Sequence, residues 1–166
     1  MMAEINTKVV YRSIGLAKEY ALAAPKEFLY QEYHAIGKRY SATIAAYSLA
    51  AFAVFGQSKI MRKLIRQLGP KSDEGPTEEQ IEKGFFKLQV IGKGANQKKA
   101  SATLSFQGDA GNKATVAFLS ECALGLIINQ EELPPYKGFL TPVMAFGDIL
   151  YQRLTAAGFK IETNSI

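Results

Sequence analysis

The stretch GFLTPVMAFGD, residues 138–148, decides the fold of the carboxyl-terminal part of the chain. Thr141 is a residue type that caps helices, and Pro142 suits the first helical position, where its missing N–H would have no partner. Gly147 is typical of a helix end. The pattern predicts a turn, a helix capped by Thr141, a stop at Gly147 and, after Gly158, a final strand.

Upstream of this stretch, two segments alternate apolar and polar side chains as strands do. Residues 85–91 alternate in part, and residues 99–106 alternate more cleanly. The loop between them contains Gly92 and Gly94, which is typical of a hairpin connection. Helices interleaved with an antiparallel hairpin favour an α+β fold, in which helices pack on a small mixed sheet.

The rest of the chain predicts one more strand and several helices. β-branched and aromatic residues at positions 8–11 predict a strand, and a helical spacing begins at Ser13. Pro25 can open a second helix that runs to Ile36. A helix with acids at its positive end is expected after Thr77, and a strong apolar helix is expected after residue 112.

Composition sets broad limits on function. The 166 residues can bury a core as one domain, and 48% hydrophobic and 21% charged residues are ordinary for a soluble globular chain. The single Cys122 excludes an internal disulfide, and one cysteine with one histidine does not make up a usual zinc cluster. The first residues lack the basic and apolar segments of a secretory signal, so an intracellular location is expected.

The net charge of +5 is compatible with several classes of partner and selects none of them. Nucleic acid is not an expected partner, because tyrosine and phenylalanine lie mainly in apolar stripes and not beside basic residues.

Residues 41–58 contain no charged side chain and predict a long apolar helix near residues 41–56. A core helix is the first interpretation, an interfacial membrane anchor is the second, and a membrane span is the third, because 18 residues only reach the lower limit for spanning. A basic amphipathic helix follows, so an anionic membrane surface is a candidate partner for residues 41–66. A solvated charged face is the alternative for residues 59–66.

No pattern in the sequence predicts a nucleotide site or a catalytic group. The Gly92-Lys93-Gly94 run lacks the third glycine and the following helix of a dinucleotide fingerprint, which favours a hairpin turn. His34 has no orienting acid on its predicted helix face, and Cys122 lies on an apolar stripe, as structural cysteines do. Asp109 could be an acid placed for chemistry, but an Asp before a helix more often stabilises the turn.

Several short motifs occur in a fixed order along the chain. They are Arg12-Ser13 after an apolar run, GPTEEQ at residues 75–80, the pair Gly92 and Gly94, GDAG at residues 108–111 with Asp109 and Gly111, Glu121 two residues before Ala123, and the tail with Gly138, Thr141, Pro142 and Gly147. In these motifs the chain resembles the carboxyl-terminal domain of the saccharopine dehydrogenase-like oxidoreductases, which include the trans-acting enoyl reductases. Lys137 and Asn112 depart from the family pattern, which has glycine and an aromatic residue there.

The resemblance implies one domain over residues 1–166, on the substrate and dimerisation side of an NAD(P)-dependent oxidoreductase. In that family the NAD(P)-binding Rossmann half comes first, and this chain does not contain its pattern. The motif positions are therefore expected to be structural, with no catalytic, cofactor-binding or metal-binding residue among them. NAD(P) is expected only if a partner supplies the Rossmann half; the chain alone is expected to bind none and not to be catalytic alone. Hydride transfer to a carbonyl, imine or enoyl substrate would follow if that half is supplied.

The expected protein partners are the Rossmann half, further copies of the chain or a larger assembly. A non-catalytic structural or membrane-associated subunit of a larger complex is the second hypothesis. Several eukaryotic members of the family carry a hydrophobic segment at the place of residues 41–58, and the resemblance therefore implies the mitochondrion or the lipid droplet as candidate locations.

Overall fold

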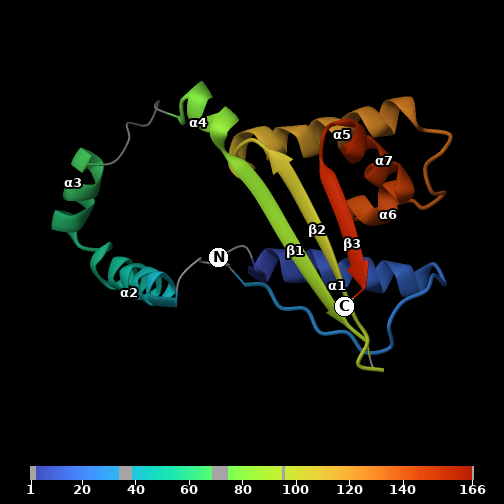
Figure 1. Ribbon diagram of the computed structural model, residues 1–166, viewed down its shortest axis with the longest axis horizontal. Helices are drawn as coiled ribbons and strands as arrows, with labels where there is room; N and C mark the ends of the chain where they lie inside the picture. The colour runs from blue at the N-terminus through green and yellow to red at the C-terminus, as the bar shows by residue number, and fades with distance from the viewer. Residues whose placement is uncertain (1–2, 34–38, 69–74, 95, 166) are drawn as a thin grey trace. The chain divides into compact units, whose positions relative to one another are not determined.

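The structure, a computed structural model, describes residues 3–33, 39–68, 75–94 and 96–165. It divides into two compact units: a main unit of Met1–Tyr30 with Thr77–Ile166, and a small unit of Gln31–Pro76. Each unit is described by itself (Figure 1).

Helices and antiparallel strands make up the main unit, which confirms the α+β fold. Its elements are α1 (Ala3–Glu19), α4 (Glu78–Lys83), β1 (Phe85–Lys93), β2 (Lys99–Gln107), a π-helical turn η1 (Ala110–Ala114), α5 (Thr115–Ile128), α6 (Pro142–Phe146), α7 (Asp148–Ala156) and β3 (Lys160–Ser165). The small unit contains α2 (Arg39–Phe55) and α3 (Lys59–Leu68).

The three strands form one sheet in the order β1-β2-β3, and both pairs are antiparallel. The predicted hairpin is confirmed, with Phe86 opposite Phe106 and Leu88 opposite Leu104. A mixed sheet was expected, but the sheet is antiparallel throughout. The helices between β2 and β3 return the chain to the end of the sheet where β2 finishes, and β3 therefore runs against β2.

Aromatic side chains form the core between one face of the sheet and the helices that follow it. Phe106 of β2 stacks on Phe159 at 4.3 Å between ring centroids, and Phe118 of α5 lies 4.5 Å from Phe159. Ala114 and Leu154 are buried in the same cluster. Such aromatic pairs contribute about 0.5–1.5 kcal/mol beyond their buried area. This cluster fixes α5 and α7 against the sheet.

The segment predicted as a strand at positions 8–11 lies instead within α1. Val9 and Tyr11 favour strands intrinsically, but tertiary packing can override such preferences. Leu16 of the same helix is 2% exposed and anchors it in the main unit. The helix ends just before Ala21, which has the left-handed φ of 54°.

The helix predicted from Pro25 is absent over the described residues 24–33, which are irregular. The Tyr11 hydroxyl donates to the carbonyl oxygen of Phe28 at 3.1 Å, and the two rings lie 5.9 Å apart. This contact holds the segment against α1. The rest of the prediction, including His34 and Ile36, lies outside the described residues.

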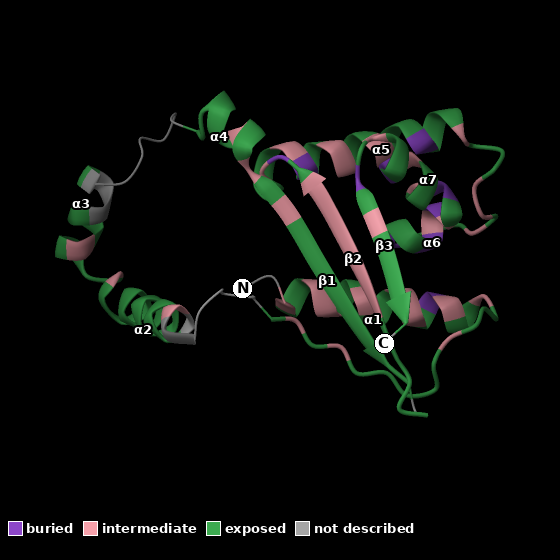
Figure 2. Ribbon diagram, in the orientation of Figure 1, coloured by how far each residue is buried: buried purple, intermediate pink, exposed green. Residues whose placement is uncertain are grey.

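The small unit confirms the apolar helix expected near residues 41–56, as α2. It does not bury that helix as a core, because every residue from 43 to 55 is exposed (Figure 2). Ser58 accepts a hydrogen bond from the N–H of Met61 at the start of α3.

Candidate functional site

The tail segment before α6 is fastened to α1 by its side chains. The hydroxyls of Ser13 and Thr141 lie 2.8 Å apart, and Thr141 is 7% exposed. The Ser13 hydroxyl donates to the carbonyl oxygen of Val9 at 2.9 Å. Because a hydroxyl has one proton, Thr141 is the donor to Ser13. The position expected to cap a helix therefore uses its hydroxyl to join two segments of the fold.

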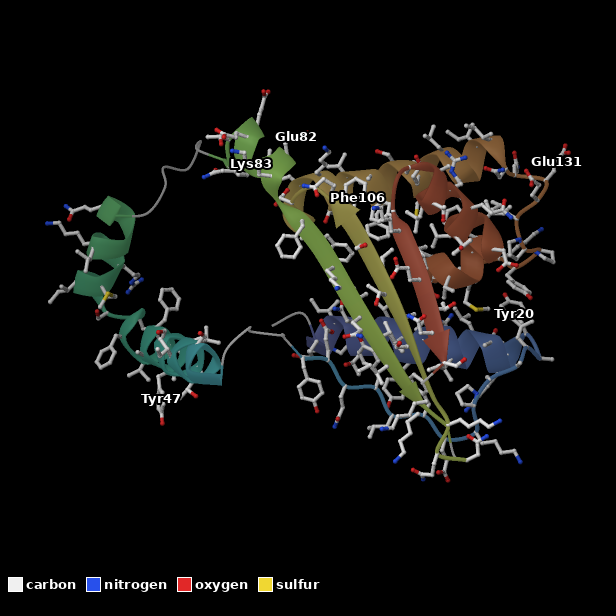
Figure 3. The ribbon with its side chains drawn as sticks, viewed as in Figure 1. Tyr20, Tyr47, Glu82, Lys83, Phe106 and Glu131 are labelled. Atoms are coloured by element: carbon white, nitrogen blue, oxygen red, sulfur yellow. The ribbon has the colours of Figure 1, made fainter. Side chains whose placement is uncertain are left out.

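Two further hydrogen bonds join α1 to the same tail segment, and we call this set of contacts the α1 seam. Arg12 Nη2 donates to the carbonyl oxygen of Phe139 at 3.3 Å, and the Tyr20 hydroxyl donates to that of Lys137 at 3.1 Å. The carbonyl of Phe139 follows Gly138, whose φ is +100°. Figure 3 shows Tyr20 near the end of α1, and its ring lies 4.2 Å from that of Tyr136. The seam thus orders the residues that lead into the tail helices.

The tail helices follow the predicted outline with one difference. Pro142 is at the start of α6 and Thr141 has extended N-cap dihedrals, as expected, but the Thr141 side chain makes no capping hydrogen bond. Gly147, with φ +53° and ψ −133°, separates α6 from α7. A strand after Gly158 is confirmed as β3.

Asp109 closes the turn between β2 and η1. Its carboxylate accepts hydrogen bonds from the N–H groups of Gly111, Asn112 and Lys113 at 2.8–3.1 Å. These bonds, first from Asn112 and then from Lys113, hold the pKa of Asp109 below its ordinary value of 3.8. The carboxylate is therefore fully used in ordering the start of the helix.

Two glycine-containing turns bear on whether NAD(P) fits this chain. The Gly92 and Gly94 pair belongs to the β1–β2 hairpin, where the N–H of Gly94 donates to the carbonyl oxygen of Lys98 at 2.9 Å. The turn at residues 108–111 does join a strand to a helix, but Asp109 already occupies the N–H groups that a phosphate would need. Neither turn therefore offers a pyrophosphate the free N–H groups of a strand-turn-helix site.

Glu121 of α5 and Arg153 of α7 form an ion pair that the sequence does not predict. Arg153 Nη2 lies 2.8 Å from Glu121 Oε2, and the same guanidinium donates to the carbonyl oxygen of Glu121 and to Asn129 Oδ1. Glu121 belongs to the motif before Ala123, but its separation of 32 residues from Arg153 leaves no spacing signal. The pair joins α5 to α7.

The remaining candidates do not assemble into a reactive group. Cys122 is half-buried; burial raises the pKa of its thiol, and the neighbouring Glu121 carboxylate raises it further. A raised pKa leaves less of the nucleophilic thiolate. Across the described ranges, no three His, Cys, Asp or Glu side chains gather as a metal site would require. The motif residues divide among the α1 seam, the hairpin, the Asp109 turn and the α5–α7 contact.

Two open hollows lie on the main unit. One, of about 530 Å³, lies between α4 and the Asp109 turn and includes Gln80 and Lys83. The helix start expected after Thr77 is confirmed there as α4, and Thr77 and Gln80 exchange hydrogen bonds as a capping box. The other, of about 360 Å³, lies on the sheet over Gly92, Ala102 and Thr163. Each is a shallow surface feature, and neither contains a catalytic set.

Helix α5 presents an exposed apolar face on the main unit. Val116, Leu119 and Ile127 recur on one face and are 60%, 71% and 75% exposed. The helix over Ala110–Ile128 is long and apolar enough to cross a membrane by length and composition. Since Ala114 of η1 and Phe118 of α5 pack into the aromatic core, we interpret α5 as a core helix whose outer face is open.

Curated relatives match this chain along its whole length. A Mycobacterium tuberculosis protein provisionally named trans-acting enoyl reductase is 30% identical over 173 residues, and the chain covers 41% of it. Proteins named trans-acting enoyl reductase from Mycobacterium bovis and Mycobacterium leprae are 29% and 28% identical, with 40% of each covered. The chain thus spans about two fifths of the length of these relatives.

These names agree with the enoyl reductase part of the expected resemblance and do not extend to its saccharopine dehydrogenase-like part. No protein-family model matches the chain, and no solved structure matches it significantly.

Proposed function

We propose that this chain is the carboxyl-terminal, substrate-side portion of an NAD(P)-dependent oxidoreductase of the trans-acting enoyl reductase kind, and that it is not catalytic alone. The full-length similarity to two fifths of the relatives carries the proposal. In this proposal the other three fifths of such a protein supply the cofactor site.

The geometry of the glycine turns supports this division of labour. The hairpin at Gly94 and the turn filled by the Asp109 carboxylate leave no strand-turn-helix site for a pyrophosphate among the described residues. The order imposed by the α1 seam and by the Glu121–Arg153 pair suits a scaffold. The complete enzyme would reduce a carbon–carbon double bond conjugated to a carbonyl group, with NAD(P)H bound by the complementary portion.

The open face of α5 is the surface we assign to that complementary portion. Leu119 and Ile127 lie on it, and exposed apolar patches of this kind mark protein interfaces. We assign the complementary portion as the occupant of this face because about three fifths of each relative lie outside the part that matches this chain. Covering this face would remove apolar side chains from water without disturbing the aromatic core behind it.

Titration with NADPH tests the proposal. The chain alone should bind NADPH no more tightly than about 1 mM, whereas the complementary portion of the M. tuberculosis relative should bind it in the micromolar range. Tight stoichiometric binding of NADPH by the chain alone contradicts the proposal.

Sedimentation of the two portions together tests the assigned surface. Leu119→Ser with Ile127→Ser should weaken their association by roughly tenfold or more, because each side chain loses apolar burial. The matched control is Phe85→Ser with Ile91→Ser, which changes two exposed side chains on the opposite face of the sheet. Equal weakening by both double variants contradicts the assignment to α5.

A non-catalytic structural or membrane-associated subunit of a larger complex is the second candidate function. The exposed apolar helix α2 favours it, because such a helix requires a covering surface outside the described contacts. Reductase activity in a hybrid protein that contains this chain decides against it.

A further inference from the structure

The positive charge of the chain is concentrated in one segment. Seven of the 20 lysine and arginine residues, and none of the 15 acidic residues, lie in the segment from Tyr33 to Ser72 inclusive. The remaining 126 positions therefore contain 13 basic and 15 acidic residues. The net charge of +5 is thus a property of the segment that includes α2 and α3, and not of the main unit.

Helix α2 is apolar and exposed around its circumference. Its large side chains include Tyr47, Phe52 and Val54, which are 75%, 59% and 70% exposed. Figure 3 shows the Tyr47 side chain pointing away from the helix. At about 1.5 Å per residue, its 17 residues extend about 25 Å, which is less than the roughly 30 Å of a bilayer core. The helix suits partial insertion and not a full crossing.

Helix α3 separates its charged and apolar side chains onto opposite sides. At about 100° per residue, Lys59, Arg62 and Lys63 fall within an arc of about 100°. Ile60, Met61 and Leu64 fall within an arc of similar width on the other side, and Ile60 is 84% exposed. The connection at residues 56–58 is short, so the basic face of α3 begins where the apolar helix α2 ends.

We propose that α2 and α3 bind an anionic lipid membrane surface, with α2 embedded among the acyl chains and the cations of α3 at the phosphate level. A membrane accounts for both observations at once. A protein partner covers one face of a helix, whereas α2 exposes side chains all round, and a segment with seven cations and no acid complements a negative surface. This binding is independent of the proposed reductase function.

Flotation of the full chain with lipid vesicles tests the contribution of the α3 cations to membrane binding. The chain should float with phosphatidylcholine vesicles that contain about 30% phosphatidylserine, and binding should fall steeply in about 0.5 M salt. Lys59→Gln, Arg62→Gln and Lys63→Gln together should weaken binding on the order of 100-fold, at about fivefold per cation. The matched control removes three exposed lysines of the main unit, in Lys93→Gln, Lys98→Gln and Lys99→Gln, and should bind nearly as the unchanged chain does.

A tryptophan reporter tests the insertion of α2. The chain contains no tryptophan, so Phe52→Trp reports from α2 alone. Its emission should shift to shorter wavelength when anionic vesicles are added, because the indole leaves water. Phe139→Trp is the control, since Phe139 is 96% exposed in the main unit and its emission should not shift.

Three results overturn the proposal. They are no flotation with anionic vesicles at low salt, equal weakening by the α3 and control charge variants, and a Phe52→Trp emission that vesicles leave unchanged. Circular dichroism of each variant checks that the helices are formed. A loss of binding can then be assigned to the changed side chains and not to unfolding.

Discussion

Arg153 and Glu121 form the most buried ion pair among the described residues, with 2.8 Å between Nη2 and Oε2 and side chains 17% and 19% exposed. The same guanidinium donates to Asn129 Oδ1 at 3.0 Å, so one side chain joins α7, α5 and the loop after α5. This contact holds the helix whose outer face we assign to the complementary portion.

Truncation of Arg153 should destabilise the main unit. Arg153→Ala leaves the Glu121 carboxylate with little solvent and no cation, and should cost roughly 2–4 kcal/mol. Arg12→Ala is the control, because it removes one exposed hydrogen bond and should cost less than about 0.5 kcal/mol. The measurement is urea unfolding followed by circular dichroism. Equal losses in the free energy of unfolding for the two substitutions would contradict a stabilising role of the ion pair.

The Ser13–Thr141 hydrogen bond should appear as a coupling energy. Thr141→Val keeps the shape of a buried side chain and removes its donor, which should cost about 1 kcal/mol. In a double-mutant cycle with Ser13→Ala, the coupling between the two positions should be about 1 kcal/mol. A coupling of zero would mean that the seam does not depend on this bond.

Gly147 should not tolerate a side chain. Its φ of +53° with ψ −133° is a conformation that residues with a Cβ rarely adopt, and Gly147→Ala should cost roughly 1–3 kcal/mol. Gly15→Ala is the control: Gly15 is within α1 with open space around it, and alanine should stabilise by about 0.5–1 kcal/mol there. Thermal unfolding should therefore shift in opposite directions, and a neutral Gly147→Ala would refute the assigned strain.

The Asp109 turn should make stability depend on acid pH. The pKa of Asp109 is lowered in the folded state, so its stabilisation is complete above the unfolded pKa and is lost as pH falls through the folded one. Asp109→Asn keeps a cap acceptor but removes the charge, and should be less stable than the unchanged chain at neutral pH. The difference should shrink as pH falls below 3.8 and through the lowered folded pKa, in urea unfolding measured at several pH values. A difference that is constant with pH would contradict the role of the charge.

Local patterns predicted the elements whose signals are local. The alternation at residues 99–106, the helix start after Thr77 and the Pro142 helix start each depend on neighbours within a few positions. They are confirmed because nothing in the tertiary structure opposes them. The strand predicted at residues 8–11 is wrong for the converse reason, since burial of Leu16 and the seam to Thr141 favour a helix there.

The contacts of the candidate site could not be predicted from spacing. Ser13 and Thr141 are separated by 128 residues, and Glu121 and Arg153 by 32, so only the folded chain brings them together. The exposure of α5 could not be predicted from the sequence either. An apolar stripe predicts burial, but it does not say whether this chain supplies the covering surface.

The most direct measurement is the reductase activity of a hybrid in which this chain replaces the matching two fifths of the M. tuberculosis relative. We predict NADPH oxidation that depends on an α,β-unsaturated acyl thioester and exceeds that of the complementary portion alone. A hybrid that folds and binds NADPH but oxidises none with this substrate would contradict the account, as would NADPH oxidation by the chain alone.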